Sequence, residues 1–155
     1  MKAYADCPAA TSGSSSLPTA YRLIGSTSGA PWGNPNWFEL SEVELFDQND
    51  LRVSPNFEIK TALQGGNGAN IQSGQKWPSE GFSVWTPYSA FAGQALVEWD
   101  GGFDLTRASL WTTNVESFGT NPRIEKEENG VWSNAGITIA INYPAQGNMI
   151  RDTPS

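Results

Sequence analysis

The chain has 155 residues, the size of one domain, which is large enough to bury a core without disulfides or metal ions. Hydrophobic residues make up 38% of it and charged residues 16%, and its 16 glycines and 10 prolines divide it into short segments, as is typical of all-β proteins. The formal charge of −7 argues against nucleic acid and anionic membranes as partners, because both are negatively charged.

The first 19 residues contain a segment rich in Ala, Ser and Gly, over residues 9–18. Such a segment has too little apolar surface to fold by itself. We expect residues 1–19 to form a flexible arm, which either stays disordered or becomes ordered on a neighbouring subunit. No signal peptide is recognised in this arm, and no apolar run in the chain approaches the roughly 20 residues that span a bilayer. The sequence therefore predicts a soluble protein.

The first strands are expected over residues 21–24 and from Trp37 onward. Residues 42–45 alternate glutamate with valine and leucine, the pattern of a strand with one buried side and one side in water. Phe38 and Leu40 have the opposite parity. We therefore predict a β-bulge near Ser41, which returns all the apolar side chains to the core.

A turn is predicted over residues 47–50, because Asp and Asn favour turns by bonding to their own backbone. Asp47, Asn49 and Asp50 also carry oxygens that could bind calcium. The rest of an EF-hand loop is absent, so the turn explains this cluster without an ion. We expect no cofactor, with calcium kept as the alternative.

The remaining strands are predicted from alternating or β-branched residues. Asn129-Gly130 between two strand-like runs predicts a hairpin, whereas residues 64–95 are irregular and rich in aromatic residues. The other strands are expected over residues 57–63, 95–99, 103–113, 123–127, 131–132 and 137–143. About eight strands without helices indicate an antiparallel β-sandwich or jelly roll, which we place over residues 20–144, followed by a C-terminal tail over residues 145–155.

Three pairs of stretches, in this order along the chain, resemble the discoidin or coagulation-factor C-type domains of the galactose-binding-like β-sandwiches. They are residues 21–23 with 40–46, 97–100 with 103–105, and 122–125 with 129–132. The family's Asp-Gly-x-x-Thr-x-Trp segment and its paired cysteines are absent, since Cys7 is the only cysteine. The resemblance implies a sandwich that binds ligands, sugars among them, through loops at one end and without catalysis.

Aromatic residues in the expected loops are the main candidates for a binding site. Sugars bind by laying C–H faces on aromatic rings and by hydrogen bonding to side-chain amides and carboxylates. The predicted ligand-binding residues are Trp32, Asn34, Asn36, Trp77, Trp85 and Tyr88. Two alternatives remain open: the rings fill the ends of the sandwich, or they anchor a protein interface.

Catalysis has little support in the sequence. The chain has no histidine, which removes the usual Ser-His-Asp and Cys-His nucleophiles and the commonest ligand of transition metals. A glycosidase needs only two carboxylates. The candidates are Glu125, Glu127 and Glu128, or Asp100 with Asp104. Their setting is that of a solvated strand and a turn, so we expect no enzyme.

These observations predict a non-catalytic structural or adhesion module. We expect a virion component, such as a bacteriophage tail or capsid-surface protein, that docks on neighbouring subunits or on copies of itself and binds host glycan. The alternatives are a free-standing carbohydrate-binding module and a carboxylate-dependent glycoside hydrolase. Neither nucleic acid nor insertion into a membrane is expected.

Overall fold

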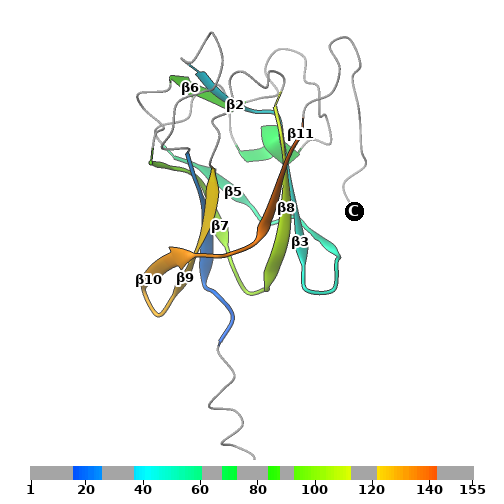
Figure 1. Cartoon of the computed structure of the whole chain (residues 1–155), viewed down its shortest axis with the longest axis vertical. Helices are drawn as coiled ribbons and strands as arrows, with labels where there is room; N and C mark the ends of the chain where they lie inside the picture. The colour runs from blue at the N-terminus through cyan, green and yellow to red at the C-terminus, as the bar shows by residue number, and fades with distance from the viewer. Residues whose placement is uncertain are drawn as a thin grey trace, which may run out of the picture.

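A computed structural model describes residues 16–25, 37–60, 68–72, 84–87, 93–112 and 122–142, without the side chains of residues 37–39, 70 and 84–87. Eleven strands and one short 3-10 helix occur in these ranges, and no α-helix does. The strands form two larger sheets that face each other and a separate two-stranded sheet (Figure 1). The predicted all-β class is confirmed, as a two-sheet fold consistent with a β-sandwich.

The larger sheet has five strands, and each strand is antiparallel to its neighbours. The order across this sheet is β10 (Val131–Asn134), β9 (Arg123–Glu128), β1 (Ala20–Ile24), β7 (Ala95–Asp100) and β5 (Phe57–Ile59). Strand β1 lies in the centre of this sheet, although it is the first of the described strands in the sequence. The N-terminal strand is therefore built into the middle of the fold.

The second sheet has four strands, in the order β11 (Thr138–Asn142), β8 (Leu105–Trp111), β3 (Glu42–Asp47) and β4 (Arg52–Val53). Strands β11 and β8 are parallel, so the prediction of a purely antiparallel fold is wrong for this pair. A parallel pair needs a crossover. Here the chain supplies it by leaving β8, forming β9 and β10 in the other sheet, and returning to β11.

Three further elements complete the described chain. Strands β2 (Trp37–Leu40) and β6 (Val84–Pro87) form the separate antiparallel pair. The 3-10 helix η2 (Gly68–Gln72) contributes Ile71, which is fully buried, to the core. Strand β6 and helix η2 both lie in the segment that the sequence pattern leaves irregular.

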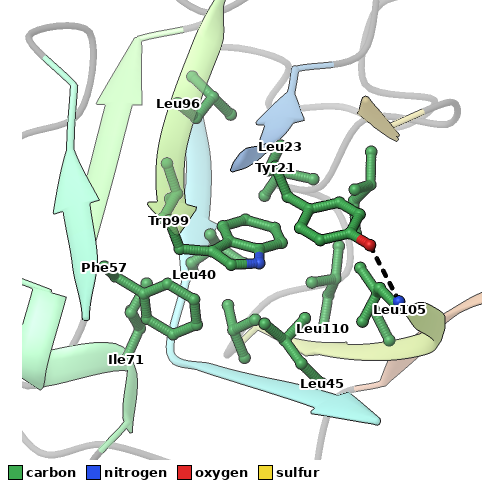
Figure 2. Close-up of a cluster of buried hydrophobic side chains, with 14 residues drawn as sticks. Tyr21, Leu23, Leu40, Leu45, Phe57, Ile71, Leu96, Trp99, Leu105 and Leu110 are labelled. Atoms are coloured by element: carbon green, nitrogen blue, oxygen red, sulfur yellow. Dashed lines mark hydrogen bonds between the residues drawn. The ribbon is translucent and has the colours of Figure 1, made fainter. Parts of the chain in front are cut away.

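The core lies between the two large sheets. On the five-stranded side, Trp99 packs edge-on against Phe57 and stacks on Tyr21, with ring centroids 5.4 Å and 6.0 Å apart. Leu45 and Leu110 of the other sheet are fully buried in the same cluster (Figure 2). The buried indole N–H of Trp99 has no hydrogen-bond acceptor among the described residues. Trp99 therefore stabilises the core through its ring area.

Ser41 interrupts the chain at the predicted place, but the interruption is a change of sheet and not a bulge within one strand. Strand β2 pairs with β6, whereas β3 pairs with β8 and β4. Leu40, Val43 and Leu45 are all buried, as the predicted shift in parity requires.

The predicted solvent exposure of Glu42 and Glu44 is wrong, because both are buried. Arg52 on β4 lies between them, with its guanidinium nitrogens 3.4 Å from a Glu42 oxygen and 3.3 Å from a Glu44 oxygen. Trp111 on β8 donates its indole N–H to the other oxygen of Glu44, at 2.9 Å. Buried charges require such partners, and here the partners come from two neighbouring strands.

Both predicted turns are confirmed. Asn129 and Gly130 have φ values of 53° and 79°, the left-handed conformations that a two-residue hairpin turn requires. In the turn over residues 47–50, an Asp47 carboxylate oxygen accepts the N–H groups of Asn49 and Leu51. Asp50 pairs with Arg107 at 2.8 Å. No group of three or more potential metal ligands occurs within the described part of the chain.

Candidate ligand-binding cavity at one end of the sheets

The site residues predicted from the sequence cannot be placed. Trp32, Asn34, Asn36, Trp77 and Tyr88 lie outside the described residues. Trp85 lies in β6, but its side chain is not described. A site built on the aromatic loops therefore stays a prediction.

The described residues form a different concave site where two connections meet. Residues 54–56 lead from β4 to β5, and residues 101–104 lead from β7 to β8. Two cavities of about 410 and 210 Å³ lie here, and both are lined by Asn56 and Asp100. The larger cavity is also lined by Val53, Ser54, Pro55, Gly101 and Phe103, and the smaller one by Phe57, Glu58, Glu98 and Trp99.

The pairing of β5 with β7 sets the two sides of this site. Phe57 lies opposite Trp99 in the register, and Glu58 lies opposite Glu98. Successive side chains of a strand point to opposite faces. The two aromatic rings therefore face the core while the two carboxylates face outward. The smaller cavity is lined by residues of this strand pair, and Glu58 and Glu98 give it negative charge.

The loop over residues 101–104 is held firmly against the N-terminal segment. Gly101 donates its N–H to the Thr19 carbonyl, and Gly102 donates to the Pro18 carbonyl, both at 2.9 Å. A Cβ at Gly101 would lie 2.0 Å from the Pro18 oxygen, so only glycine permits this approach. Phe103 stacks on Tyr21 with ring centroids 5.4 Å apart. This wall of the cavity is therefore fixed by contacts within the chain.

The opposite wall is fixed by the 3-10 helix. Gln72 of η2 donates its side-chain N–H to the carbonyl of Pro55, in the middle of residues 54–56. Gly68 of the same helix packs directly on Phe57, because a Cβ there would lie 2.0 Å from the Phe57 carbonyl oxygen. The cavity therefore lies between two connections that are each held in place, as expected of a preformed binding site.

The charge around the cavity is negative. Lys60 pairs with Glu58 at 3.2 Å and with Glu98 at 3.6 Å. The hydrogen bond to Glu58 is the largest cause that raises the pKa of Lys60 above its usual 10.5. Asp100 makes no ion pair with any described residue. Among the described residues, the three carboxylates of Glu58, Glu98 and Asp100 therefore outnumber the ammonium group of Lys60. This excess of negative charge favours ligands that donate hydrogen bonds and disfavours anions.

The carboxylates of the predicted glycosidase alternative have other roles. Glu125 lies between Arg22 and Arg123, whose nitrogens approach its oxygens to 2.7 and 2.9 Å. Burial raises the pKa of Glu125, but the hydrogen bonds from the two arginines outweigh this effect and leave its pKa below the usual 4.5. A general acid in a glycosidase needs a raised pKa.

The other two carboxylates of that set are also engaged. Glu127 accepts the Thr19 hydroxyl at 2.8 Å, and Glu128 pairs with Lys126 at 3.2 Å. The contact of Glu127 with Thr19 and that of Glu125 with Arg22 tie β9 to the N-terminal part of the chain, whereas Lys126 and Glu128 both lie on β9. Glu125 and Glu127 therefore have a structural role in the fold.

The chain was compared with protein-family models, curated proteins and solved structures, and none of the three comparisons found a match. Within the described ranges, no helix has the length and apolar character needed to cross a membrane. The kind of ligand that the cavity could bind is therefore inferred from the residues that line it.

The sequence pattern did not single out Asn56 or Phe103 as site residues. Asn56 follows Ser54-Pro55 between two short strands, and Asp100 is followed by two glycines, so both positions indicate turns. That these two turns meet depends on the pairing of β5 with β7. The only local signal is that polar residues stand at neighbouring strand ends.

Proposed function

We propose that this chain is a non-catalytic recognition module that binds a neutral polar ligand, such as a saccharide residue, in the cavity between residues 54–56 and 100–103. The observation that carries the proposal is the combination of apolar and polar groups around one fixed cavity. Val53 and Phe103 offer apolar surface to the C–H face of a sugar. Asn56 and Asp100 offer hydrogen-bonding groups to its hydroxyls.

The charge of the cavity narrows the class of ligand. Asp100 lines this cavity, and Glu58 and Glu98 line the smaller cavity beside it. Among the described residues, Lys60 is the one cation that pairs with these two glutamates. Neutral sugars and amino sugars are therefore expected to bind better than sialylated, sulfated or phosphorylated ones, because like charges repel.

A glycan array with matched variants tests the proposal. Wild type should retain neutral oligosaccharides, and Asn56→Ala or Asp100→Asn should weaken retention about tenfold or more, the usual effect of losing a hydrogen bond to a ligand hydroxyl. Asp104→Asn is the matched control, since Asp104 lies in the same loop but does not line the cavity. Absence of any retained glycan, or equal retention by all four proteins, would refute the proposal.

We also propose that the fold is a discoidin-like jelly roll and that the protein is part of a virion. The stretches that resemble discoidin domains fall mainly on β1, β3, β7 and the β9–β10 hairpin, all within the two packed sheets. This supports a discoidin-like jelly roll. The virion setting follows from the sequence features alone, and mass spectrometry of purified virus particles from the source would test it directly.

A further inference from the structure

Exposed apolar side chains gather at the end of the molecule where the N-terminal segment enters. Among the described residues, four large hydrophobic side chains are exposed, and three of them lie here: Leu17 (47% exposed), Leu51 (61%) and Val131 (65%). Leu51 ends the β3–β4 turn, and Val131 follows the β9–β10 turn. Figure 1 shows both hairpins and the N-terminal segment at the lower end of the two sheets.

Hydrogen bonds connect these segments to one another. Thr19 donates its N–H to the Glu127 carbonyl beside the β9–β10 turn and accepts the Gly101 N–H from the β7–β8 loop. The same loop reaches the β3–β4 turn, where the Asp104 N–H donates to the side-chain carbonyl of Gln48 at 3.3 Å. Leu17, Leu51 and Val131 are therefore carried by segments that are connected to one another through fixed contacts.

The surface around these side chains is acidic. Its carboxylates are Asp47, Asp50, Asp104, Glu127 and Glu128, and its basic side chains are Arg107 and Lys126. Both basic groups are already paired within the set, Arg107 with Asp50 and Lys126 with Glu128. Among the described residues at this end the net charge is therefore negative, because Asp47, Asp104 and Glu127 pair with no basic side chain that the structure describes.

We propose that this acidic end is a docking surface for another protein whose matching surface is basic and has pockets for aliphatic side chains. A protein interface usually has a buried apolar core that is surrounded by a polar rim. The negative charge of this surface favours a partner with a basic surface. A second copy of this chain would bring the same acidic end, and an anionic lipid surface would also be repelled.

Leu51 and Val131 line neither of the cavities that contain Asn56 and Asp100, so the two proposals can fail separately. The probe is a display library of random peptides of about 12 residues, selected on the immobilised full-length chain. Wild type is expected to select peptides that combine Lys or Arg with aliphatic or aromatic residues. Their binding should weaken at high salt, because screening reduces the attraction between exposed charges.

A double variant, Leu51→Ser with Val131→Ser, should weaken binding of the selected peptides about tenfold or more. Ile141→Ser is the matched control, because Ile141 is the fourth exposed hydrophobic residue but lies on β11, outside these turns. It should leave peptide binding unchanged. Both changes are at exposed positions, so the melting temperature should change little in either protein.

Several results would overturn the proposal. Selected peptides without an excess of basic residues would exclude a basic partner, and equal binding by the double variant would exclude this surface. Self-association of wild type that the double variant abolishes would assign the surface to a second copy of the chain. Retention on phosphatidylserine vesicles that the double variant loses would assign it to lipid. Glycan retention should be the same in wild type and in the double variant.

Discussion

At the scale of single residues, Tyr21 connects the two sheets. Its ring lies in the core beside Trp99, and its hydroxyl donates to the Phe103 carbonyl at 2.9 Å. The same oxygen accepts the N–H of Leu105, the first residue of β8, at 3.0 Å. Burial raises the pKa of Tyr21 above its usual 10.0, so the hydroxyl stays protonated and can donate at neutral pH.

Replacing Tyr21 with Phe should therefore destabilise the fold. The change leaves the core ring in place but removes the acceptor of the buried Leu105 N–H, and it should lower the free energy of unfolding by about 1–3 kcal/mol. Urea denaturation followed by tryptophan fluorescence measures the difference. A loss of less than about 0.5 kcal/mol would show that the hydroxyl does not connect the sheets.

Glu125 gives a prediction about pH. Its folded-state pKa lies below 4.5, so its stabilising contribution is present above the unfolded-state value and is lost as the pH falls through the folded-state value. Glu125→Gln should cost about 1–2 kcal/mol at pH 7, a modest figure because Arg22 and Arg123 are partly exposed.

The check is to compare both proteins at two pH values. The free energies of unfolding of wild type and Glu125→Gln should converge as the pH falls through the folded-state pKa of Glu125, which lies below 4.5, because the carboxylate then takes up a proton. A difference that stays the same at both pH values would mean that the ion pairs contribute nothing.

At the scale of elements, local signals predicted turns well, but they could not predict which side chains are exposed. The Asn129-Gly130 hairpin depends on two adjacent residues, and the structure confirms it. For Glu42 and Glu44, alternation correctly separates their face from that of Val43 and Leu45. Their burial depends on Arg52 and Trp111, which reach them only through the pairing of β3 with β4 and β8.

The hairpin at Asn129-Gly130 supplies a prediction about backbone conformation. Gly130 has a φ of 79°, and a Cβ there would meet no atom within 4 Å, so Gly130→Ala has a purely conformational cost of about 1 kcal/mol. Asn129→Gly is the matched control and should be almost neutral, because glycine also adopts a positive φ. Thermal unfolding of both variants measures the contrast. Equal melting temperatures would argue against this turn geometry.

At the scale of the whole molecule, composition predicted the all-β class, but the arrangement of the strands could not be predicted. The parallel pairing of β8 with β11 follows from the two strands between them joining the other sheet. The position of the cavity also depends on how the strands pair. Asn56 and Asp100 stand at the ends of neighbouring strands that are far apart in the sequence, and no local pattern shows that these strands pair.

The central claim is that recognition takes place in a fixed cavity at one end of two packed sheets. The most direct test is an NMR titration of the ¹⁵N-labelled chain with the neutral oligosaccharides retained on the array, or with a panel of monosaccharides. We predict that amide signals of residues 54–58 and 98–103 shift while those of the β9–β10 hairpin do not. Shifts confined to residues 30–36 or 77–88, or none with any sugar, would contradict the claim.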